Sequence, residues 1–155
     1  MARAARKKVL FVCLGNACRS PMAEAIARRD AGDVIEASSA GLTPLGRIEG
    51  MTRETLERNG YSCEGLESKP MVREALDAAD LVINLSGRAK EWAFEDISKV
   101  EDWRVEDPYG ADAELYQRIF AEIERRVAEL STMLRNGASD GAAGRNMQDK
   151  NTAER

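Results

Sequence analysis

The 155-residue sequence contains no histidine. A Ser-His-Asp or Cys-His mechanism is therefore excluded, because both use an imidazole as the general base. A zinc site is disfavoured as well, since only scattered cysteines and carboxylates remain as possible ligands. We expect any chemistry of this chain to use neither an imidazole nor a zinc ion.

Excess positive charge and long apolar runs are lacking too. The net charge is −4 and no basic face is evident, so nucleic acid is not an expected partner. No apolar run reaches the roughly 20 residues that a bilayer-spanning helix needs, so we expect no membrane association. The three cysteines show no disulfide-framework spacing, which predicts reduced thiols and a cytoplasmic location.

The composition that remains is that of one globular domain. A hydrophobic fraction of 43% and a charged fraction of 32% fit a folded chain, and 155 residues suffice for one sizeable core. We expect a basic leader at 1–7 and a domain at 8–135. A disordered tail is expected at 136–155, where apolar periodicity ends.

Short apolar segments alternate with helical patterns along this domain. Strands are predicted at 8–13, 34–39, 81–85 and 99–105, and helices at 22–29, 52–58, 72–78, 88–92 and 115–134. This alternation favours an α/β fold with a parallel sheet covered on both faces. Ligands of such sheets bind beyond the carboxyl ends of the strands. Cys13 and Asp107 each follow a predicted strand and are expected at that edge.

The segment CLGNACRS, residues 13–20, lies between a predicted strand and a predicted helix. A loop of this length can curl until successive backbone N–H groups point at one centre, where the helix adds the positive end of its dipole. Arg19 can bind two oxygens of one anion as a fork. We therefore predict a cradle for a tetrahedral oxyanion. The predicted phosphate-binding residues are Leu14, Gly15, Asn16, Ala17, Cys18, Arg19 and Ser20.

The same positive field would stabilise a thiolate at Cys13 and make its sulfur a nucleophile. Ser20 can donate a hydrogen bond to that sulfur, and Gly15 would allow close backbone approach or a positive φ. A cysteine at a strand end is by default a buried packing residue. The order of residue types in this loop favours the nucleophile instead. A Walker loop is excluded because the glycine-lysine-serine ending is missing.

The longer segment VCLGNACRSPMAE, residues 12–24, resembles the signature loop of the low-molecular-weight protein tyrosine phosphatases and the related thioredoxin-coupled arsenate reductases. Weaker similarities follow in the same order at Ser39-Ala40-Gly41, Gly60, Ser68-Lys69 and Asp107-Pro108-Tyr109. The resemblance covers about residues 8–135. It implies a phosphotyrosine protein phosphatase I-like, three-layer fold with a four-stranded parallel sheet, and neither metal nor cofactor.

By this resemblance Cys13 would be the nucleophile, Arg19 the phosphate clamp and Asp107 the general acid. Cys18 would form a reversible disulfide with Cys13 that protects the nucleophile from over-oxidation.

The resemblance also implies supporting and rim residues. Asn16 and Ser20 would hold the loop and the thiolate, and the rim of the substrate site would include Leu45, Ile48 and Tyr109. Arg88 is interpreted as a solvated helix residue, although a contribution to the electrostatics of the cavity mouth stays open.

The implied activity is hydrolysis of phosphomonoesters, protein phosphotyrosine first among them, through a cysteinyl-phosphate intermediate. The thioredoxin-coupled reductases use two further cysteines, and this sequence has Ser86 and Ala93 in their places. Two alternatives stay open: an arsenate reductase that uses Cys13 with an external thiol, and an oxyanion-binding module without turnover. The expected partner is a phosphorylated protein or a small phosphomonoester. The oligomeric state is left open, with a monomer slightly favoured.

Overall fold

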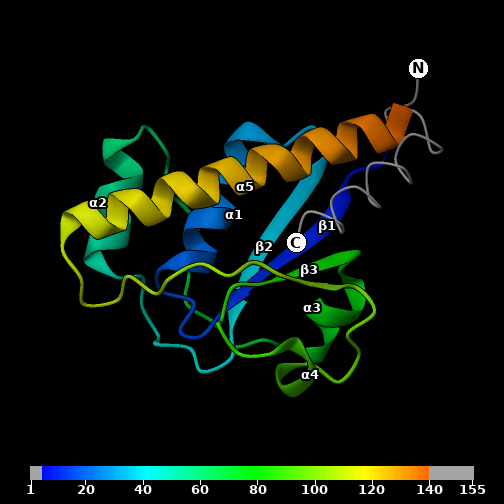
Figure 1. The fold of residues 1–155 in the computed structure, drawn as a ribbon, viewed down its shortest axis with the longest axis horizontal. Coiled ribbons are helices and arrows are strands. Elements are labelled where there is room, and N and C mark those ends of the chain that lie inside the picture. Colours follow the sequence, from blue (N-terminus) through cyan, green and yellow to red (C-terminus); the bar gives the residue numbers. More distant parts are fainter. Residues whose placement is uncertain (1–4, 140–155) are drawn as a thin grey trace.

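The protein is described here by a computed structural model that covers residues 5–139, and its centre is a four-stranded sheet with the strand order β2-β1-β3-β4 (Figure 1). The strands are β1 (Lys7–Cys13), β2 (Ile35–Gly41), β3 (Leu81–Asn84) and β4 (Val100–Asp102). All three neighbouring pairs are parallel, so the carboxyl ends of the strands meet at one edge. The expected parallel sheet is confirmed.

Helices cover both faces of the sheet. They are α1 (Arg19–Asp30), α2 (Gly50–Arg58), α3 (Arg73–Ala78), α4 (Lys90–Ala93) and α5 (Ala113–Ser139). One core lies beneath α1, α2 and α5, and a second, smaller core lies beneath α3 and α4. Figure 1 shows the long helix α5 crossing the face that α1 also covers. The three-layer α/β architecture expected from the sequence is confirmed.

The central strand β1 is buried on both faces, which accounts for its apolar sequence. Phe11 and Cys13 point into the larger core, whereas Leu10 and Val12 point into the smaller one, because successive side chains of a strand face opposite sides. A strand buried on both faces reads as a continuous apolar run rather than an alternating one. This burial fixes the position of Cys13, the last residue of β1, at the edge where the strands end.

Several expected boundaries were wrong. β4 ends at Asp102 rather than 105, because the chain leaves the ladder there while Trp103 stays buried in the core. Helix α4 begins at Lys90, so Arg88 lies in the preceding loop and not on a helix. Helix α5 continues through 136–139, where a tail was expected, and the remaining predicted tail at 140–155 lies outside the described residues, as does the 1–4 part of the leader.

Within residues 5–139, no helix combines the length and the apolar character that a bilayer crossing requires.

The last turns of α5 are anchored to the loop after α1 by a two-pronged ion pair. Arg135 donates from Nε to Asp33 Oδ2 and from Nη2 to Asp33 Oδ1, each at 2.8 Å. The hydrogen bond from Arg135 lowers the pKa of the Asp33 carboxyl to about 2. A carboxyl group with a lowered folded-state pKa stabilises the fold above its unfolded pKa, about 3.9 for aspartate, and loses that contribution as the pH falls through the folded value.

We therefore predict that Asp33→Asn lowers the thermal unfolding temperature slightly at pH 7, and that the difference from the wild type shrinks as the pH falls from about 5 towards 2. Circular dichroism melting curves across this pH range measure the effect. Glu129→Gln, which breaks an exposed 3.3 Å pair on the same helix, is the matched control. A deficit of Asp33→Asn that stays constant with pH would contradict the prediction.

Candidate active site

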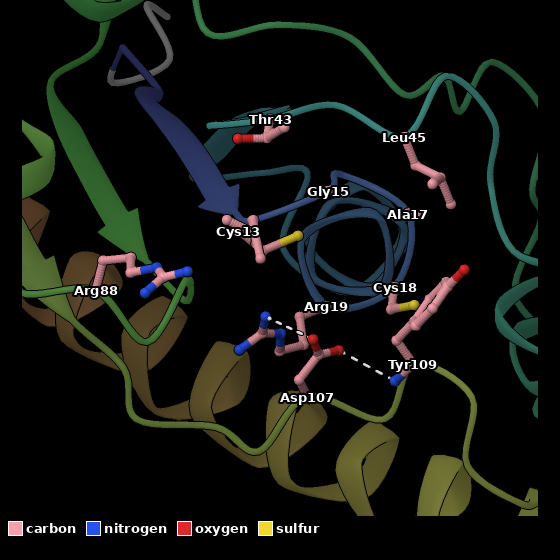
Figure 2. Close-up of a pocket in the computed structure, with 11 residues that line it drawn as sticks. Cys13, Gly15, Ala17, Cys18, Arg19, Thr43, Leu45, Arg88, Asp107 and Tyr109 are labelled. Atoms are coloured by element: carbon pink, nitrogen blue, oxygen red, sulfur yellow. Dashed lines mark hydrogen bonds and ion pairs between the residues drawn. The ribbon is translucent and has the colours of Figure 1, made fainter.

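A cavity of about 330 Å³ opens at the carboxyl edge of the sheet (Figure 2). It is formed by the loop that joins β1 to α1 together with the segments that follow β2, β3 and β4. Its lining residues are Cys13, Leu14, Gly15, Ala17, Cys18, Arg19, Thr43, Leu45, Arg88, Asp107 and Tyr109. The structure thus brings the expected nucleophile, clamp and acid, which are 94 residues apart at most in the sequence, into one cavity.

The loop after β1 turns its backbone carbonyl groups outward. Leu14 O accepts a hydrogen bond from Thr43 N at 2.8 Å, and Gly15 O accepts one from Leu45 N at 2.9 Å. The Cys13 and Ala17 carbonyls are likewise bonded to the segment that follows β2. Since the C=O and N–H of one peptide unit point in opposite directions, this pairing turns loop N–H groups towards the cavity. The expected oxyanion cradle has its physical basis in these contacts.

Asn16 supplies the backbone conformation that closes the loop. Its φ of 48° is the single positive value among the non-glycine residues of the described chain, whereas the expected positive φ at Gly15 is not observed. Asparagine tolerates this left-handed conformation better than most side-chain-bearing residues. Asn16 is fully buried and does not line the cavity, so its contribution to phosphate binding is to shape the loop.

The side chain of Asn16 also holds the loop from outside. Its Nδ2 donates to Ser20 Oγ at 2.8 Å and to Ser39 Oγ at 3.0 Å, while its Oδ1 accepts from Lys69 N at 2.9 Å. Ser39 Oγ in turn donates to the buried carboxylate of Glu24. Ser39, Ser68 and Lys69, which contribute to the family resemblance of the sequence, therefore contact the loop directly.

Ser20 lies 3.0 Å from the Cys13 sulfur, as the sequence predicted it could. Either atom of this pair can be the donor, and Ser20 Oγ also lies 3.5 Å from the Ala40 carbonyl oxygen, to which it can donate. When the hydroxyl donates to a sulfur, it stabilises the anionic form of that sulfur. Asn16, Ser20 and Cys13 thus form one connected set of hydrogen bonds.

Arg19 is buried beneath the cavity with 4% of its surface exposed. Its Nη1 donates to Val105 O at 3.1 Å, and its Nη2 lies 3.5 Å from Asp107 Oδ2. Its Nε is buried and has no hydrogen-bond partner within the described residues. An unpaired buried donor costs about 1–3 kcal/mol, so the Nε/Nη2 edge of the guanidinium is ready to receive an anion.

Asp107 lies on the wall of the cavity, half-exposed. Its Oδ1 accepts a hydrogen bond from Tyr109 N at 3.1 Å, and its Oδ2 faces Arg19, as Figure 2 shows. The Asp-Pro-Tyr segment therefore forms a turn, and this turn aims the carboxylate at the guanidinium. The catalytic interpretation and the turn interpretation of this segment are both compatible with the geometry.

Cys18 has a different environment from Cys13. Burial raises the pKa of the Cys18 thiol, which also lies 3.3 Å from the Tyr116 hydroxyl. The thiol is therefore kept in its protonated form at neutral pH. Both cysteines are reduced and both line the cavity, and the disulfide between them stays a prediction.

The structure corrects the expected rim. Leu45 and Tyr109 line the cavity, but Ile48 is 6% exposed and packs in the larger core, because the chain turns inward at this point to begin α2. Thr43 lines the cavity and was missed, and Arg88, whose contribution to the cavity mouth was left open, lines it too. Their positions just after β2 and β3 were the available signal, since parallel sheets bind ligands beyond the carboxyl ends of their strands.

Comparisons with known proteins agree with this arrangement. Residues 8–139 match the family model described as low molecular weight phosphotyrosine protein phosphatase. The chain is 34% identical to the glutaredoxin arsenate reductase of Synechocystis sp., over 80% of this chain and 95% of that protein. It is 29% identical to the protein-arginine-phosphatase of Bacillus subtilis, over 82% of this chain and 96% of that protein.

The chain is also similar in fold and sequence to a solved structure. The low molecular weight protein tyrosine phosphatase from T. tengcongensis matches with a TM-score of 0.71 and 32% identity, over 80% of this chain and 97% of that chain. These three similar proteins are named for three different activities, so similarity alone does not choose among them.

The close approach of β2 to the loop generates a prediction. A Cβ atom at Gly41 would lie 2.9 Å from both the Cβ and the backbone N of Asn16, which is too close. We expect Gly41→Ala to displace the loop and to weaken vanadate binding and turnover by about 100-fold, the cost of a misplacement of about 1 Å.

Gly50→Ala is the matched control, because a Cβ at Gly50 meets nothing within 4 Å. Vanadate affinity from calorimetry and steady-state kinetics on an aryl phosphate measure the effect, with circular dichroism to verify folding. Equal behaviour of the two variants would contradict the role given to Gly41.

Proposed function

The chain belongs to the low molecular weight phosphotyrosine protein phosphatase family, and we propose that it hydrolyses phosphomonoesters through a covalent intermediate on Cys13. The observation that carries this proposal is the shared cavity of Cys13, Arg19 and Asp107, in which the Arg19 Nε has no partner within residues 5–139. Nucleophile, anion clamp and acid are the three groups that thiol-dependent phosphoryl transfer requires.

Substrate binding begins with the exchange of partners at Arg19. A phosphate dianion placed on the loop N–H groups accepts hydrogen bonds from Nε and Nη2 of Arg19 as a fork. Nη2 thereby turns from Asp107, 3.5 Å away, to the substrate. Asp107 is thereby separated from its cation and left facing the substrate, as a general acid has to be.

The first chemical step transfers the phosphoryl group to sulfur. The Cys13 thiolate attacks phosphorus, a sulfur–phosphorus bond forms, and the bond to the leaving oxygen breaks. Asp107 gives its proton to that oxygen, so that a neutral alcohol or phenol departs. The loop N–H groups and Arg19 stabilise the charge that develops on the phosphoryl oxygens.

The second step releases phosphate. Asp107, now a carboxylate, takes a proton from a water molecule as the water attacks phosphorus, and the sulfur–phosphorus bond breaks. The sulfur leaves as a thiolate, which Ser20 stabilises from 3.0 Å. The cycle closes with inorganic phosphate and the enzyme in its starting form.

The substrate proposed first is protein phosphotyrosine. The cavity wall beyond the loop is apolar at Leu45 and aromatic at Tyr109, which suits a flat phenyl leaving group. A tyrosine phosphatase at 32% identity supports this choice, and the arginine phosphatase at 29% identity makes phosphoarginine the second substrate to examine.

Arsenate reduction is the second candidate function, favoured by the 34% identity to a glutaredoxin arsenate reductase. Arsenate has the same tetrahedral shape as phosphate, so the same loop would bind it. The thiol supply differs, because Ser86 and Ala93 replace the two further cysteines and the remaining thiol, Cys63, does not line the cavity. Cys18 is the further thiol that lines the cavity, and a reductase of this chain would need an external thiol to return Cys13 or a Cys13–Cys18 disulfide to the reduced form.

Kinetics on aryl phosphates with two leaving groups test the phosphatase proposal. We expect Cys13→Ser to be inactive and Asp107→Asn to lower kcat by about 10²–10⁴-fold on phenyl phosphate. The loss on p-nitrophenyl phosphate should be smaller, because p-nitrophenolate leaves readily without a proton. Glu106→Gln, an exposed neighbour that does not line the cavity, is the matched control and should keep near-wild-type rates.

Two results would overturn the phosphatase proposal. A wild type that leaves every aryl phosphate intact yet reduces arsenate with a small thiol would establish the reductase. A wild type that binds phosphate and performs neither reaction would establish an oxyanion-binding module without turnover.

We also propose that Cys18 protects the nucleophile. Peroxide converts the Cys13 thiolate to a sulfenic acid, and the Cys18 thiol then displaces water to form a disulfide that a dithiol reduces back. For this step Cys18 has to leave the Tyr116 hydroxyl. We predict that dithiol restores activity to the peroxide-treated wild type but not to Cys18→Ser, measured on the same aryl phosphate. Equal recovery of both would contradict this role.

A further inference from the structure

Arg88 is the second guanidinium at the cavity, and the phosphatase mechanism does not use it. It lies in the loop between β3 and α4 and lines the cavity together with Cys13 and Arg19. Figure 2 shows it on the side of Cys13 that lies away from Leu45 and Tyr109, with the guanidinium turned towards Cys13. The cavity therefore has a positively charged wall opposite its apolar one.

The backbone of Arg88 is held firmly. Its N–H donates to Ser86 Oγ at 3.0 Å, and its carbonyl accepts from Asn84 Nδ2 at 2.8 Å. Ser86 is itself fixed, since its N–H and hydroxyl both donate to Asn84 Oδ1. Gly87, with a φ of +83°, makes the turn that this arrangement requires. Ser86, one of the two residues found where reductases have cysteine, thus helps to present Arg88.

The charge of Arg88 is not matched by a carboxylate. None of the ion pairs among residues 5–139 includes Arg88, whereas the guanidinium of Arg19 faces Asp107. The contact found for the Arg88 guanidinium is with the ring of Trp92, whose centroid is 5.9 Å away. An aromatic ring orients a guanidinium without neutralising it. Arg88 is therefore free to bind an anion.

We propose that Arg88 selects substrates that carry a second anionic group, a carboxylate or a phosphate, beside the phosphoryl group that is cleaved. The proposal rests on the phosphatase function and specifies its substrate class. In the proposed mechanism, the loop N–H groups and Arg19 already bind the oxygens of the phosphoryl group that is cleaved. Arg88 comes from a different strand end and stands at the exposed wall of the cavity, where a neighbouring group of the substrate passes. Its planar fork suits carboxylate and phosphate oxygens alike.

Binding measured without turnover gives the first test. Calorimetry at fixed ionic strength compares methylphosphonate, which has one anionic centre, with phosphonoformate, phosphonoacetate and 3-phosphonopropionate, which add a carboxylate at increasing distance. We expect the wild type to bind the best-fitting phosphonocarboxylate roughly tenfold more tightly than methylphosphonate. In Arg88→Gln this affinity ratio should fall to about one, and in Arg88→Lys to an intermediate value.

Arg47→Gln is the matched control. Arg47 lies in the segment after β2, two residues from Leu45, but it is exposed, pairs with Glu49 and does not line the cavity. Arg47→Gln should keep the wild-type affinity ratio, because it removes a nearby positive charge but leaves the Arg88 guanidinium in the cavity. A ratio that is unchanged in Arg88→Gln, or that falls equally in Arg47→Gln, would overturn the proposal. The proposal would also be overturned if the wild type bound none of the three phosphonocarboxylates more tightly than methylphosphonate.

Turnover distinguishes the two sources of the second anion. Values of kcat/KM are compared for phosphotyrosine peptides with glutamate or glutamine beside the phosphorylated residue, and for small phosphomonoesters with or without a carboxylate. An Arg88-dependent preference for the acidic peptides identifies a protein substrate, and one confined to the small phosphocarboxylates identifies a metabolite. The absence of both preferences would count against Arg88 as a selector.

The two proposals fail in different ways. Arg88-dependent binding of phosphonocarboxylates by a protein that hydrolyses no phosphomonoester would refute the phosphatase function and keep the second anion site. Active hydrolysis with no such binding preference would refute the role of Arg88 and keep the phosphatase.

Discussion

The active site depends on a buried positive charge without a full set of partners. Arg19 lies beneath the loop with one nitrogen bonded to Val105, one facing Asp107 and Nε unpaired within the described chain. A guanidinium in this state favours any tetrahedral anion that reaches it. The proposed anion binding therefore depends on the incomplete pairing of this one buried cation.

This arrangement survives only if the loop keeps its curled shape, and three neighbouring segments maintain it. The segment after β2 takes up the loop carbonyls, Ser68 and Lys69 bond to Gly15 O and Asn16 Oδ1, and Gly41 allows the end of β2 to come close. The positive φ of Asn16 is conformationally unfavourable, and three hydrogen bonds of its side chain offset this cost. Residues outside the loop therefore hold the loop in its curled shape.

The family contains proteins named for arsenate reduction and for phosphatase action, and the two reactions act on oxyanion groups of the same tetrahedral shape. What separates the two reactions is the supply of thiols and the chemistry of the cavity wall. Here Ser86 stands where a reductase would have cysteine, and it supports a loop that presents Arg88 to the cavity. The same wall that lacks the thiol thus has a cation.

Local sequence patterns were enough to predict the parallel α/β sheet, the loop at 13–20 and the pairing of Ser20 with Cys13. These follow from local patterns: apolar runs bounded by helical segments, and a fixed spacing of residues across one loop. The packing of distant segments places the positive φ at Asn16, Ile48 in the core and Arg88 at the cavity. Each of these depends on which distant segment packs beside the residue, as Ser39 and Lys69 do beside Asn16 from 23 and 53 positions away, and the local pattern does not record that choice.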